Sequence, residues 1–429
     1  MWYPLKEPIA SAITAFGRKW KIDAHYFAKN SFFVLIGQAV GFLRGIVSGY
    51  LVARFFDQAV YGEYQFMLSI MGLLALLGIP GMATPVARAW SRGESFSLRA
   101  ITRHQLLVAS IGSFALLGAI PFLGFYGKQE LWPLFLCAAI LFPLPPIAMV
   151  RFGSYTVGKA RFDISLRANL IWSSISVVLT TCIILFYQSA LLVLVVAVAT
   201  PPLVYFVMSR NFRPPETKGK DESGNIIRFA WNLTFASLPA DLAWYLDKLM
   251  ISHFFGLNQL ALFSVAILIP EQAKVFTKQF FPVAFAKQAA IIDNRATRLK
   301  LLQAVFVGTA IFVVGIAGYV ILCPFVIPFL FPNYDAQQLV FLTSVAAVTL
   351  VTNPASLFAQ YLEAQGMLRE TRIAQWGAAV VFATLLVALI PTMGLVGALV
   401  ARGVFRLAYV GIAAWYALGS PLRGAPTPA

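Results

Sequence analysis

Long apolar runs recur along the chain between Phe32 and Leu418, separated by short polar and charged segments. Each run is close to the roughly 20 residues that a helix needs to cross the hydrocarbon core of a bilayer. The runs lack the alternating pattern of barrel strands, and only helices and closed barrels satisfy their backbone groups in lipid. The pattern therefore predicts an all-α, multi-pass membrane protein of about twelve helices, over residues 31–53, 64–86, 104–125, 131–150, 168–187, 190–208, 226–251, 258–281, 301–322, 338–361, 373–391 and 393–418.

Interruptions are expected within and between these helices. Tight hairpins join two pairs of them, at Tyr187–Ala190 and Pro391–Met393. Proline lacks a backbone N–H and breaks the helical hydrogen-bond ladder, which leaves carbonyl groups in need of other partners. Many interrupted helices favour a transporter. The sequence predicts such breaks at Pro80, at Pro143 with Pro145 and Pro146, at Pro201 with Pro202, at Pro270 and at Asn353–Pro354.

Composition and charge agree with a membrane location. The 429 residues are 59% hydrophobic and only 12% charged, whereas a soluble domain has roughly 25% charged residues. The net charge of +16 would suggest nucleic acid in a soluble protein. Here the basic residues gather in the N-terminal tail and in alternate loops, so the positive-inside rule places both termini in the cytoplasm. The charge reflects topology, and no nucleic-acid partner is expected.

A polar segment divides the chain into two halves. Residues 210–225 (RNFRPPETKGKDESGN) have the composition of a flexible linker. The segment Ala53–Ile70 aligns without gaps to Ser252–Ile269, and both start at the outer end of the first helix of a half, so two parallel repeats are expected. The expected organisation is a cytoplasmic or interfacial segment (1–30), a six-helix lobe (31–208), a cytoplasmic linker (209–225), a second six-helix lobe (226–418) and a cytoplasmic tail (419–429).

Arg44 lies in the middle of the first apolar run, where a charge is costly and seldom faces lipid. It follows Gly37 by seven residues, which places the two about 20° apart on a helical wheel. Arg44 therefore emerges beside a packed face. It is either a cavity residue that faces an anion or an arginine bonded to neighbouring carbonyls. The face is a stripe of glycines at every fourth residue, which permits close helix contact: Gly37, Gly41, Gly45 and Gly49.

The seventh predicted helix carries three charges within DLAWYLDKLM. Asp241 and Lys248 lie seven residues apart on one face, and Asp247 points to a different side. Asp241 and Lys248 could form a structural pair or gate a polar cavity, and Lys248 could instead extend to the outer interface. The two aspartates could bind a cation or only pair with Lys248.

The eighth predicted helix contains Glu271, Lys274 and Lys278, which share one face at i, i+3 and i+7. Lys278 lies near the cytoplasmic end and could extend to the interface. Lys274 is deeper and is our preferred second cation after Arg44.

The last predicted helix contains Arg402 and Arg406, four residues apart, with Arg402 near the membrane midplane. Both arginines require acidic, carbonyl or aqueous partners at this depth. Glu363 in the tenth helix is one candidate.

No motif in the sequence points to an enzyme. The chain has no G-x-x-x-x-G-K-[ST] loop for ATP, no HExxH and no cluster of His and Cys for a metal. Cys137, Cys182 and Cys323 are isolated in apolar runs and serve as small hydrophobes. No outer loop is long enough for the active site of a membrane glycosyltransferase. We expect no catalysis and no cofactor, so the work of this protein is done between its helices.

The first two helices combine a glycine-striped helix containing Arg44, an outer-end Arg54, a D-x-x-x-Y-G-x-Y turn and Arg88 at the end of the second helix. This combination resembles the N-terminal signature of bacterial polysaccharide flippases of the Wzx type, in the multidrug/oligosaccharidyl-lipid/polysaccharide (MOP) superfamily. Asp57 stands where that family more often has glycine. The resemblance extends over nearly the whole chain, through the segments RFAWNLTFASLPADLAWYLDKLMISHFFG (228–256), FPNYDAQQ (331–338) and MGLVGALVARG (393–403).

The resemblance implies two six-helix lobes in a V, around a cavity lined by the first, second, seventh and eighth helices. It implies a polyprenyl-diphosphate-linked oligosaccharide as substrate, moved from the cytoplasmic to the periplasmic leaflet of the bacterial inner membrane. A diphosphate cannot cross about 30 Å of hydrocarbon without cationic partners. The candidate cavity cations are Arg44, Arg54, Arg88, Lys274 and Lys278, and the charges left for coupling or structure are Asp241, Asp247, Lys248, Glu271, Glu363, Arg402 and Arg406.

Membrane lipids, a polysaccharide polymerase and other assembly proteins are the further partners that this resemblance implies. Transport would draw on an ion gradient or the membrane potential. One alternative is a drug exporter of the same superfamily, which would need acids to dominate its cavity. Another is a peptidoglycan-precursor flippase, although such proteins usually carry two further helices. The non-transport alternative is a membrane enzyme acting on prenyl-linked sugars.

Overall fold

The computed structural model is all-helical, with no strand among the residues that it describes, 24–123, 129–210, 222–272, 295–365 and 367–419. Seven helices in these ranges are long and apolar enough to cross a membrane, or eight if the bent pair Gln58–Ala75 and Pro80–Arg92 forms one span. The all-α membrane class is therefore confirmed. A total of about twelve spans and the orientation of the termini remain predictions.

The helices follow the predicted apolar runs. The first half contains α2 (Ala24–Phe55), α3 (Gln58–Ala75), η1 (Leu76–Gly78), η2 (Pro80–Met82), α4 (Ala83–Arg92), α5 (Leu98–Leu123), η3 (Gln129–Leu131), α6 (Trp132–Leu141), α7 (Leu144–Ala148), the π-helical η4 (Met149–Gly153), α8 (Ser154–Gly158), α9 (Phe162–Phe186) and α10 (Ala190–Ser209). The second half contains α11 (Ser223–Phe254), a helix over residues 256–272, α13 (Arg295–Leu330), α14 (Ala336–Val348), η5 (Asn353–Ser356), α15 (Leu357–Ala364) and α16 (Leu368–Gly419).

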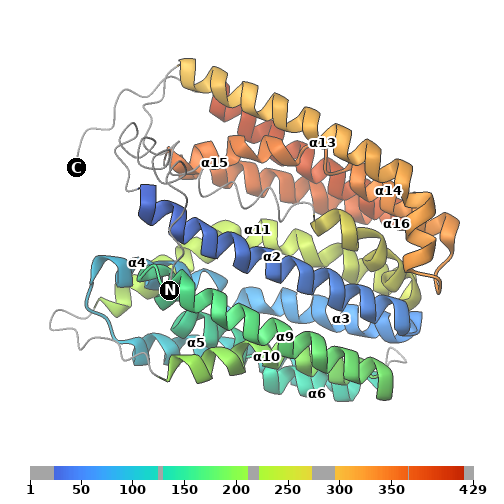
Figure 1. Cartoon of the computed structure of the whole chain (residues 1–429), viewed down its shortest axis with the longest axis horizontal. Helices are drawn as coiled ribbons and strands as arrows, with labels where there is room; N and C mark the ends of the chain where they lie inside the picture. Colours follow the sequence, from blue (N-terminus) through green and yellow to red (C-terminus); the bar gives the residue numbers. More distant parts are fainter. Residues whose placement is uncertain (1–23, 124–128, 211–221, 273–294, 366, 420–429) are drawn as a thin grey trace, which may run out of the picture.

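Two long helices lie in the middle of the molecule. Figure 1 shows α2 and α11 between a layer formed by α13 to α16 and a layer formed by the other long helices of the first half. Both central helices end at aligned positions of the internal repeat, Phe55 and Phe254. The structure thus agrees with the alignment of Ala53–Ile70 to Ser252–Ile269.

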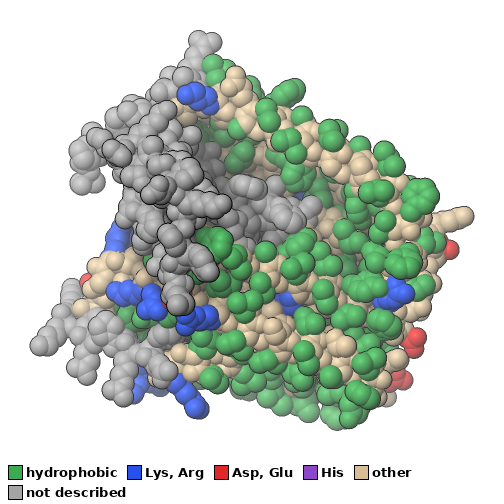
Figure 2. Space-filling view, in the orientation of Figure 1, with side chains coloured by type: hydrophobic (Ala, Val, Ile, Leu, Met, Phe, Trp, Pro, Cys, Tyr) green, Lys and Arg blue, Asp and Glu red, His purple; other side chains and the backbone are tan. Residues whose placement is uncertain are grey.

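The two ends of the molecule differ in charge. Lysines and arginines gather where α2, α5, α9 and α11 begin, at the left in Figure 2, and acidic side chains are visible mainly at the right. We call these the basic end and the far end. This division agrees with the uneven loop charges on which the predicted topology rests.

The two halves share their largest described core toward the far end. One apolar cluster there combines residues of both halves, and at the basic end α13, α15 and α16 have a separate core of their own. The N-terminal part of α11 packs instead with η2 and α4 of the first half. The shared cluster includes Val52, Phe56, Tyr61, Ile251, Leu260, Phe331 and Tyr334, and the separate core includes Leu301, Val305, Phe358, Leu362 and Ala413.

Three of the predicted proline breaks are present. Before Pro80, α3 ends and Ile79 takes a left-handed conformation, so the chain bends by 59° between α3 and Pro80–Arg92. The helix is also interrupted at Pro143, between α6 and α7, and at Asn353–Pro354, where η5 separates α14 from α15. The hairpin predicted near Pro391 is present within α16: a Cβ on Gly397 would lie 2.2 Å from the Leu389 carbonyl oxygen, and Phe382 packs against Phe405. Gly394 lies at the reversal, and its φ of +61° suits a residue without a side chain.

The breaks predicted at Pro201–Pro202 and at Pro270 are absent. Helix α10 continues through both prolines, and residues 256–272 are helical across Pro270. Membrane helices tolerate proline when neighbouring groups satisfy the carbonyls that lose their donors. For α10 those are the carbonyls of Ala197 and Val198, four residues earlier, and both residues line a cavity.

Candidate functional site

A network of ion pairs lies buried in the second half. The Arg402 Nε donates to Asp247 Oδ2, and its Nη1 donates to Glu271 Oε1 at 3.0 Å. Arg406 donates to the same Glu271 oxygen at 2.7 Å and to the Thr349 hydroxyl at 2.6 Å. The four charges come from α11, the 256–272 helix and α16. Buried charges are stable only when paired and hydrogen-bonded, so this network supports the packing of the second half.

These contacts correct the partner predicted for the arginine pair. Glu363 lies exposed on α15, whereas Asp247 and Glu271 hold Arg402 and Arg406. An i, i+4 spacing places both arginines on one face of α16. The sequence showed that they needed acidic, carbonyl or aqueous partners, but the choice among these depends on which helices pack against that face.

Lys248 lies at the edge of the network and points toward the first half. Its backbone N–H donates to Asp247 Oδ1 at 2.7 Å, and its Nζ lies 3.4 Å from Gln65 Oε1 on α3. Gln65 in turn donates to the Tyr61 hydroxyl at 2.9 Å. Lys248 therefore joins the two halves instead of extending to the interface. The side chain of Asp241, and the whole of Lys274 and Lys278, lie outside the described residues.

The glycine stripe of α2 forms the seam between the two halves. Gly37 and Gly41 face Asn169 of α9, which donates to the Gly37 carbonyl at 2.5 Å. Gly45 and Gly49 face the second half: a Cβ on Gly49 would lie 2.9 Å from Leu268 Cδ1. The stripe thus contacts one half with its first two glycines and the other half with its last two.

Arg44 lies on this seam, and no acid in the described part of the chain pairs with it. Its guanidinium carbon is 4.3 Å from the ring centroid of Trp172 on α9, a cation–π contact. Its Nε is buried and has no hydrogen-bond partner among the described residues. The second role left open by the sequence, an arginine bonded to neighbouring carbonyls, has no counterpart at Nε among the described residues.

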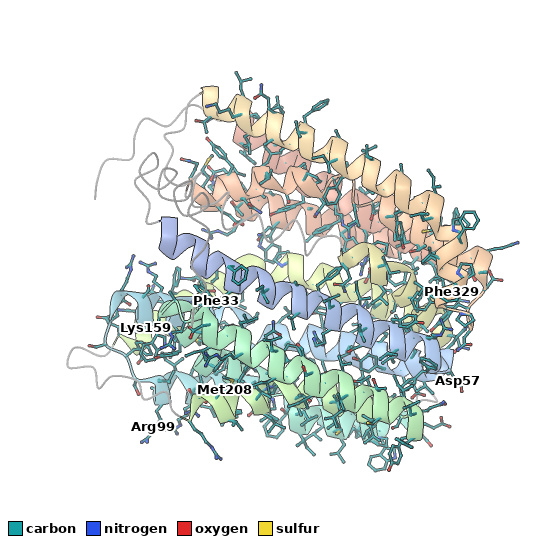
Figure 3. The ribbon with its side chains drawn as sticks, viewed as in Figure 1. Phe33, Asp57, Arg99, Lys159, Met208 and Phe329 are labelled. Carbon is teal, nitrogen blue, oxygen red and sulfur yellow. The ribbon has the colours of Figure 1, made fainter. Side chains whose placement is uncertain are left out.

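Arg54 fastens the far end of α2 to the second half. Its Nη1 lies 2.8 Å from the Tyr50 hydroxyl and the Phe329 carbonyl, and 3.2 Å from the Leu330 carbonyl. Asn333 donates back to the Arg54 carbonyl at 2.7 Å. Figure 3 shows Phe329 at this far end, together with Asp57. Arg54 therefore holds α2 and α13 together, and its guanidinium group donates to carbonyl oxygens.

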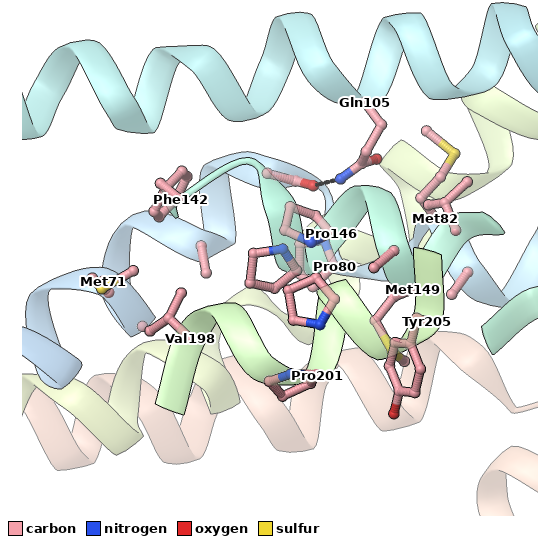
Figure 4. Close-up of a pocket in the computed structure, with 18 of the residues that line it drawn as sticks. Met71, Pro80, Met82, Gln105, Phe142, Pro146, Met149, Val198, Pro201 and Tyr205 are labelled. Carbon is pink, nitrogen blue, oxygen red and sulfur yellow. Dashed lines mark hydrogen bonds between the residues drawn. The ribbon is translucent and has the colours of Figure 1, made fainter. Parts of the chain in front are cut away.

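Three separate proline-containing segments meet around one cavity of about 560 Å³ in the first half. Figure 4 shows Pro80, Pro146 and Pro201 turned toward the same space. We call it the proline cavity. Gln105, which sequence reasoning overlooked, donates to the Gly78 carbonyl at its wall and so satisfies a group near the break at Pro80. In the sequence, Gln105 could have been noticed as a single amide side chain at the start of an apolar run.

A second, more polar pocket of about 470 Å³ adjoins the proline cavity at the basic end. The two share Ala83, Met149 and Tyr205 in their linings. Arg88 lines the polar pocket, and its guanidinium carbon lies 5.7 Å from the Phe229 ring centroid on α11. The remaining polar groups are hydroxyls, which suit hydrogen bonding to sugars or phosphate: Thr84, Ser91, Ser154, Thr156 and Ser165.

Comparison with known proteins gives both a family and a fold. Residues 27–270 match the sequence profile of the family described as polysaccharide biosynthesis protein. No curated protein matches the sequence. Three solved structures with similar folds illustrate the architecture, each at an identity too low to show more than the fold.

The first is an inward-facing multidrug resistance MATE family transporter of the MOP superfamily, with a TM-score of 0.68, 15% identity, and coverage of 89% of this chain and 93% of that one. The second is the lipid II flippase MurJ in an inward closed conformation, with a TM-score of 0.65, 11% identity, and coverage of 92% of this chain and 88% of that one. The third is a MOP superfamily transporter from Pyrococcus furiosus, described as having a binding pocket of reverse polarity. Its TM-score is 0.60 at 14% identity, with coverage of 91% of this chain and 94% of that one. The chain therefore has the fold of MOP superfamily transporters.

Proposed function

This chain belongs to the polysaccharide biosynthesis protein family, and we propose that it is a flippase for a polyprenyl-diphosphate-linked oligosaccharide, the repeat unit of a surface polysaccharide. We place it in the bacterial inner membrane with its basic end toward the cytoplasm, in agreement with the positive-inside rule. The substrate would pass from the cytoplasmic to the periplasmic leaflet. The transporter fold supports movement of a substrate in place of catalysis.

The observation that carries this proposal is the state of Arg44. Its guanidinium rests on an aromatic ring, and its Nε lacks a partner among the described residues. Cations at membrane depth are otherwise paired or aqueous because desolvation of an uncompensated charge is costly. A diphosphate is a suitable counter-ion, since guanidinium groups bind phosphate oxygens with two parallel hydrogen bonds.

The other buried arginines are less suited to this role. Arg402 and Arg406 already hold two acids, and Arg54 is bonded to carbonyls. Arg88, beside the hydroxyl-lined pocket, is the second cation that we assign to the headgroup. Lys274 and Lys278 remain candidates from the sequence. The pairing of Asp247 and Glu271 with arginines also disfavours a drug exporter that relies on acids in its cavity.

The separation of the cores suggests how the substrate moves. The halves share a core and the Arg54 contacts at the far end. At the basic end α11 still packs with the first half, whereas α13, α15 and α16 have a core of their own. Such a molecule would admit a headgroup from the basic end and release it when the far-end contacts part. An ion gradient or the membrane potential would drive the cycle.

Transport in vesicles tests the role of Arg44. The full-length protein would be reconstituted with a fluorescent polyprenyl-diphosphate oligosaccharide, and a membrane-impermeant quencher would report the label that reaches the opposite leaflet. Loss of a hydrogen bond to a charged group costs about 1.5–3 kcal/mol, so Arg44→Gln should slow transport roughly 10- to 150-fold. Arg44→Lys, which keeps the charge but loses the paired donors, should fall between this variant and the wild type.

Arg210→Gln is the matched control, because it removes an exposed arginine at the end of α10. It should transport at the wild-type rate, and all variants should reach the membrane in equal amounts. Wild-type transport by Arg44→Gln would refute the assignment of Arg44. Export of cationic dyes without movement of the glycolipid would favour the drug exporter instead.

A further inference from the structure

A basic groove lies on the outer side of the first half, apart from the central seam. Its volume is about 470 Å³, and it is lined by Arg99 and Arg103 of α5, Arg151 of η4, and the aromatic residues Trp90 and Tyr155. Figure 3 shows Arg99 at the basic end, at the lower edge of the molecule. Arg99 and Arg103 are four residues apart, so their side chains extend from the same face of α5.

The three arginines are free to bind an anion. No ion pair among the described residues joins any of them to an acid. Arg151 instead lies over the Phe206 ring at 5.9 Å. Three guanidinium groups from two elements around one groove provide donors that match the tetrahedral oxygens of a phosphate.

Trp90 supplies a second, independent sign of a missing ligand. Its side chain is only 4% exposed, and its indole Nε1 has no hydrogen-bond partner among the described residues. Phe96 and Tyr155 fix the indole, with ring centroids at 5.2 and 5.3 Å. A buried donor without a partner is costly, and an acceptor bound in the groove would satisfy it.

The surroundings of the groove suit a lipid. Leu106 lines the groove, and from there apolar side chains continue along α5 toward the far end, with Leu106 43%, Leu107 60% and Phe114 70% exposed. A phospholipid with its phosphate on the arginines would lay its acyl chains along this face. A soluble phosphate would use the arginines but would gain nothing from the leucines.

We propose that this groove binds the phosphodiester headgroup of an anionic phospholipid in the leaflet at the basic end. Basic pockets between membrane helices bind such headgroups by the same combination of charge and apolar contact. The site is separate from Arg44 and Arg88, so it stands whether or not the chain moves a glycolipid. A bound lipid would bridge α5 and η4.

Lipid binding can be counted directly by native mass spectrometry of the full-length protein in neutral detergent. The protein would be titrated with phosphatidylglycerol or with phosphatidylcholine. The triple variant R99Q/R103Q/R151Q should bind phosphatidylglycerol about 10- to 100-fold more weakly than the wild type, because each arginine near a lipid surface contributes several-fold in affinity. Binding of phosphatidylcholine should be equal in both proteins.

The control variant R167Q/R210Q/R228Q removes the same charge from exposed arginines that do not line the groove. It should retain wild-type affinity within twofold. Equal losses in the two triple variants would overturn the proposal and leave only the diffuse charge of the basic end. Full displacement of phosphatidylglycerol by millimolar inorganic phosphate would likewise overturn it, in favour of a soluble anion. If R99Q/R103Q/R151Q does not fold, Arg103→Gln alone should weaken phosphatidylglycerol binding about fivefold, and unchanged binding would refute the groove.

Discussion

Replacement of Arg402 by methionine should destabilise this protein by about 3–5 kcal/mol, because it leaves a carboxylate buried without a counter-ion. Arg402 is the only residue that an ion pair joins to Asp247 within the described part of the chain. Asp247 is fully buried, and its other hydrogen bond comes from the backbone N–H of Lys248. Methionine fills a similar volume, so the loss would come from the charge and not from a cavity.

The neighbouring arginine gives an internal comparison. Arg406→Met removes one of the two guanidinium groups on Glu271, and Arg402 still holds that carboxylate at 3.0 Å. The cost should therefore be that of one charge-assisted hydrogen bond, about 1.5–3 kcal/mol. The double variant Asp247→Leu with Arg402→Met removes both charges together. It should recover most of the stability lost in Arg402→Met, since a buried ion pair can often be replaced by hydrophobic residues at little cost.

Thermal unfolding of the purified protein measures these differences. For a chain of 429 residues, each kcal/mol lowers Tm by about 1 °C if unfolding is complete. Arg402→Met should thus lower Tm by about 3–5 °C and by more than Arg406→Met does. A Tm within 1 °C of the wild type would show that Asp247 does not depend on Arg402. A double variant no more stable than Arg402→Met would show that the stranded carboxylate is not the cause.

Two further predictions concern the far end. Arg54→Gln removes donor contacts to the Tyr50 hydroxyl and to two carbonyls of α13. Spin labels at the far ends of α2 and α13 should therefore show a longer mean distance in pulsed EPR. An unchanged distance distribution would count against the proposed role of Arg54 in holding this end closed. A Cβ on Gly62 would lie 2.2 Å from the Leu257 carbonyl oxygen, so Gly62→Ala should open the same end and slow transport in vesicles, whereas Gly118→Ala, with open space around it, should leave both unchanged. Equal behaviour of the two alanine variants would refute the close contact.

The D-x-x-x-Y-G-x-Y turn gains a physical explanation from this contact. Tyr61 lies in the shared core, and Gly62 permits the backbone of α3 to approach Leu257. The sequence carried the motif only as a family resemblance. The glycine is needed for a contact between the two halves. Its partner, Leu257, lies some two hundred residues further along the chain, so the contact could not be deduced from the motif.

The membrane class and most helix positions followed from the sequence alone. Apolar runs and proline breaks are local properties, and the energetic demands of lipid act on each segment separately. The internal repeat was also visible in the sequence, and α2 and α11 end at aligned positions, Phe55 and Phe254. The unbroken course of α10 through Pro201 was not predictable, since it depends on what surrounds the carbonyls that lose their donors.

Charges at membrane depth show the same division. The sequence established that Arg44, Arg402 and Arg406 need partners, because no isolated charge is stable in hydrocarbon. Only the tertiary structure assigned those partners: acids from two other helices for the pair on α16, and the face of Trp172 for Arg44. A helix determines which residues share its face, whereas packing determines what that face meets. Packing therefore gave Arg402 two acidic partners and placed Arg44 against an aromatic ring.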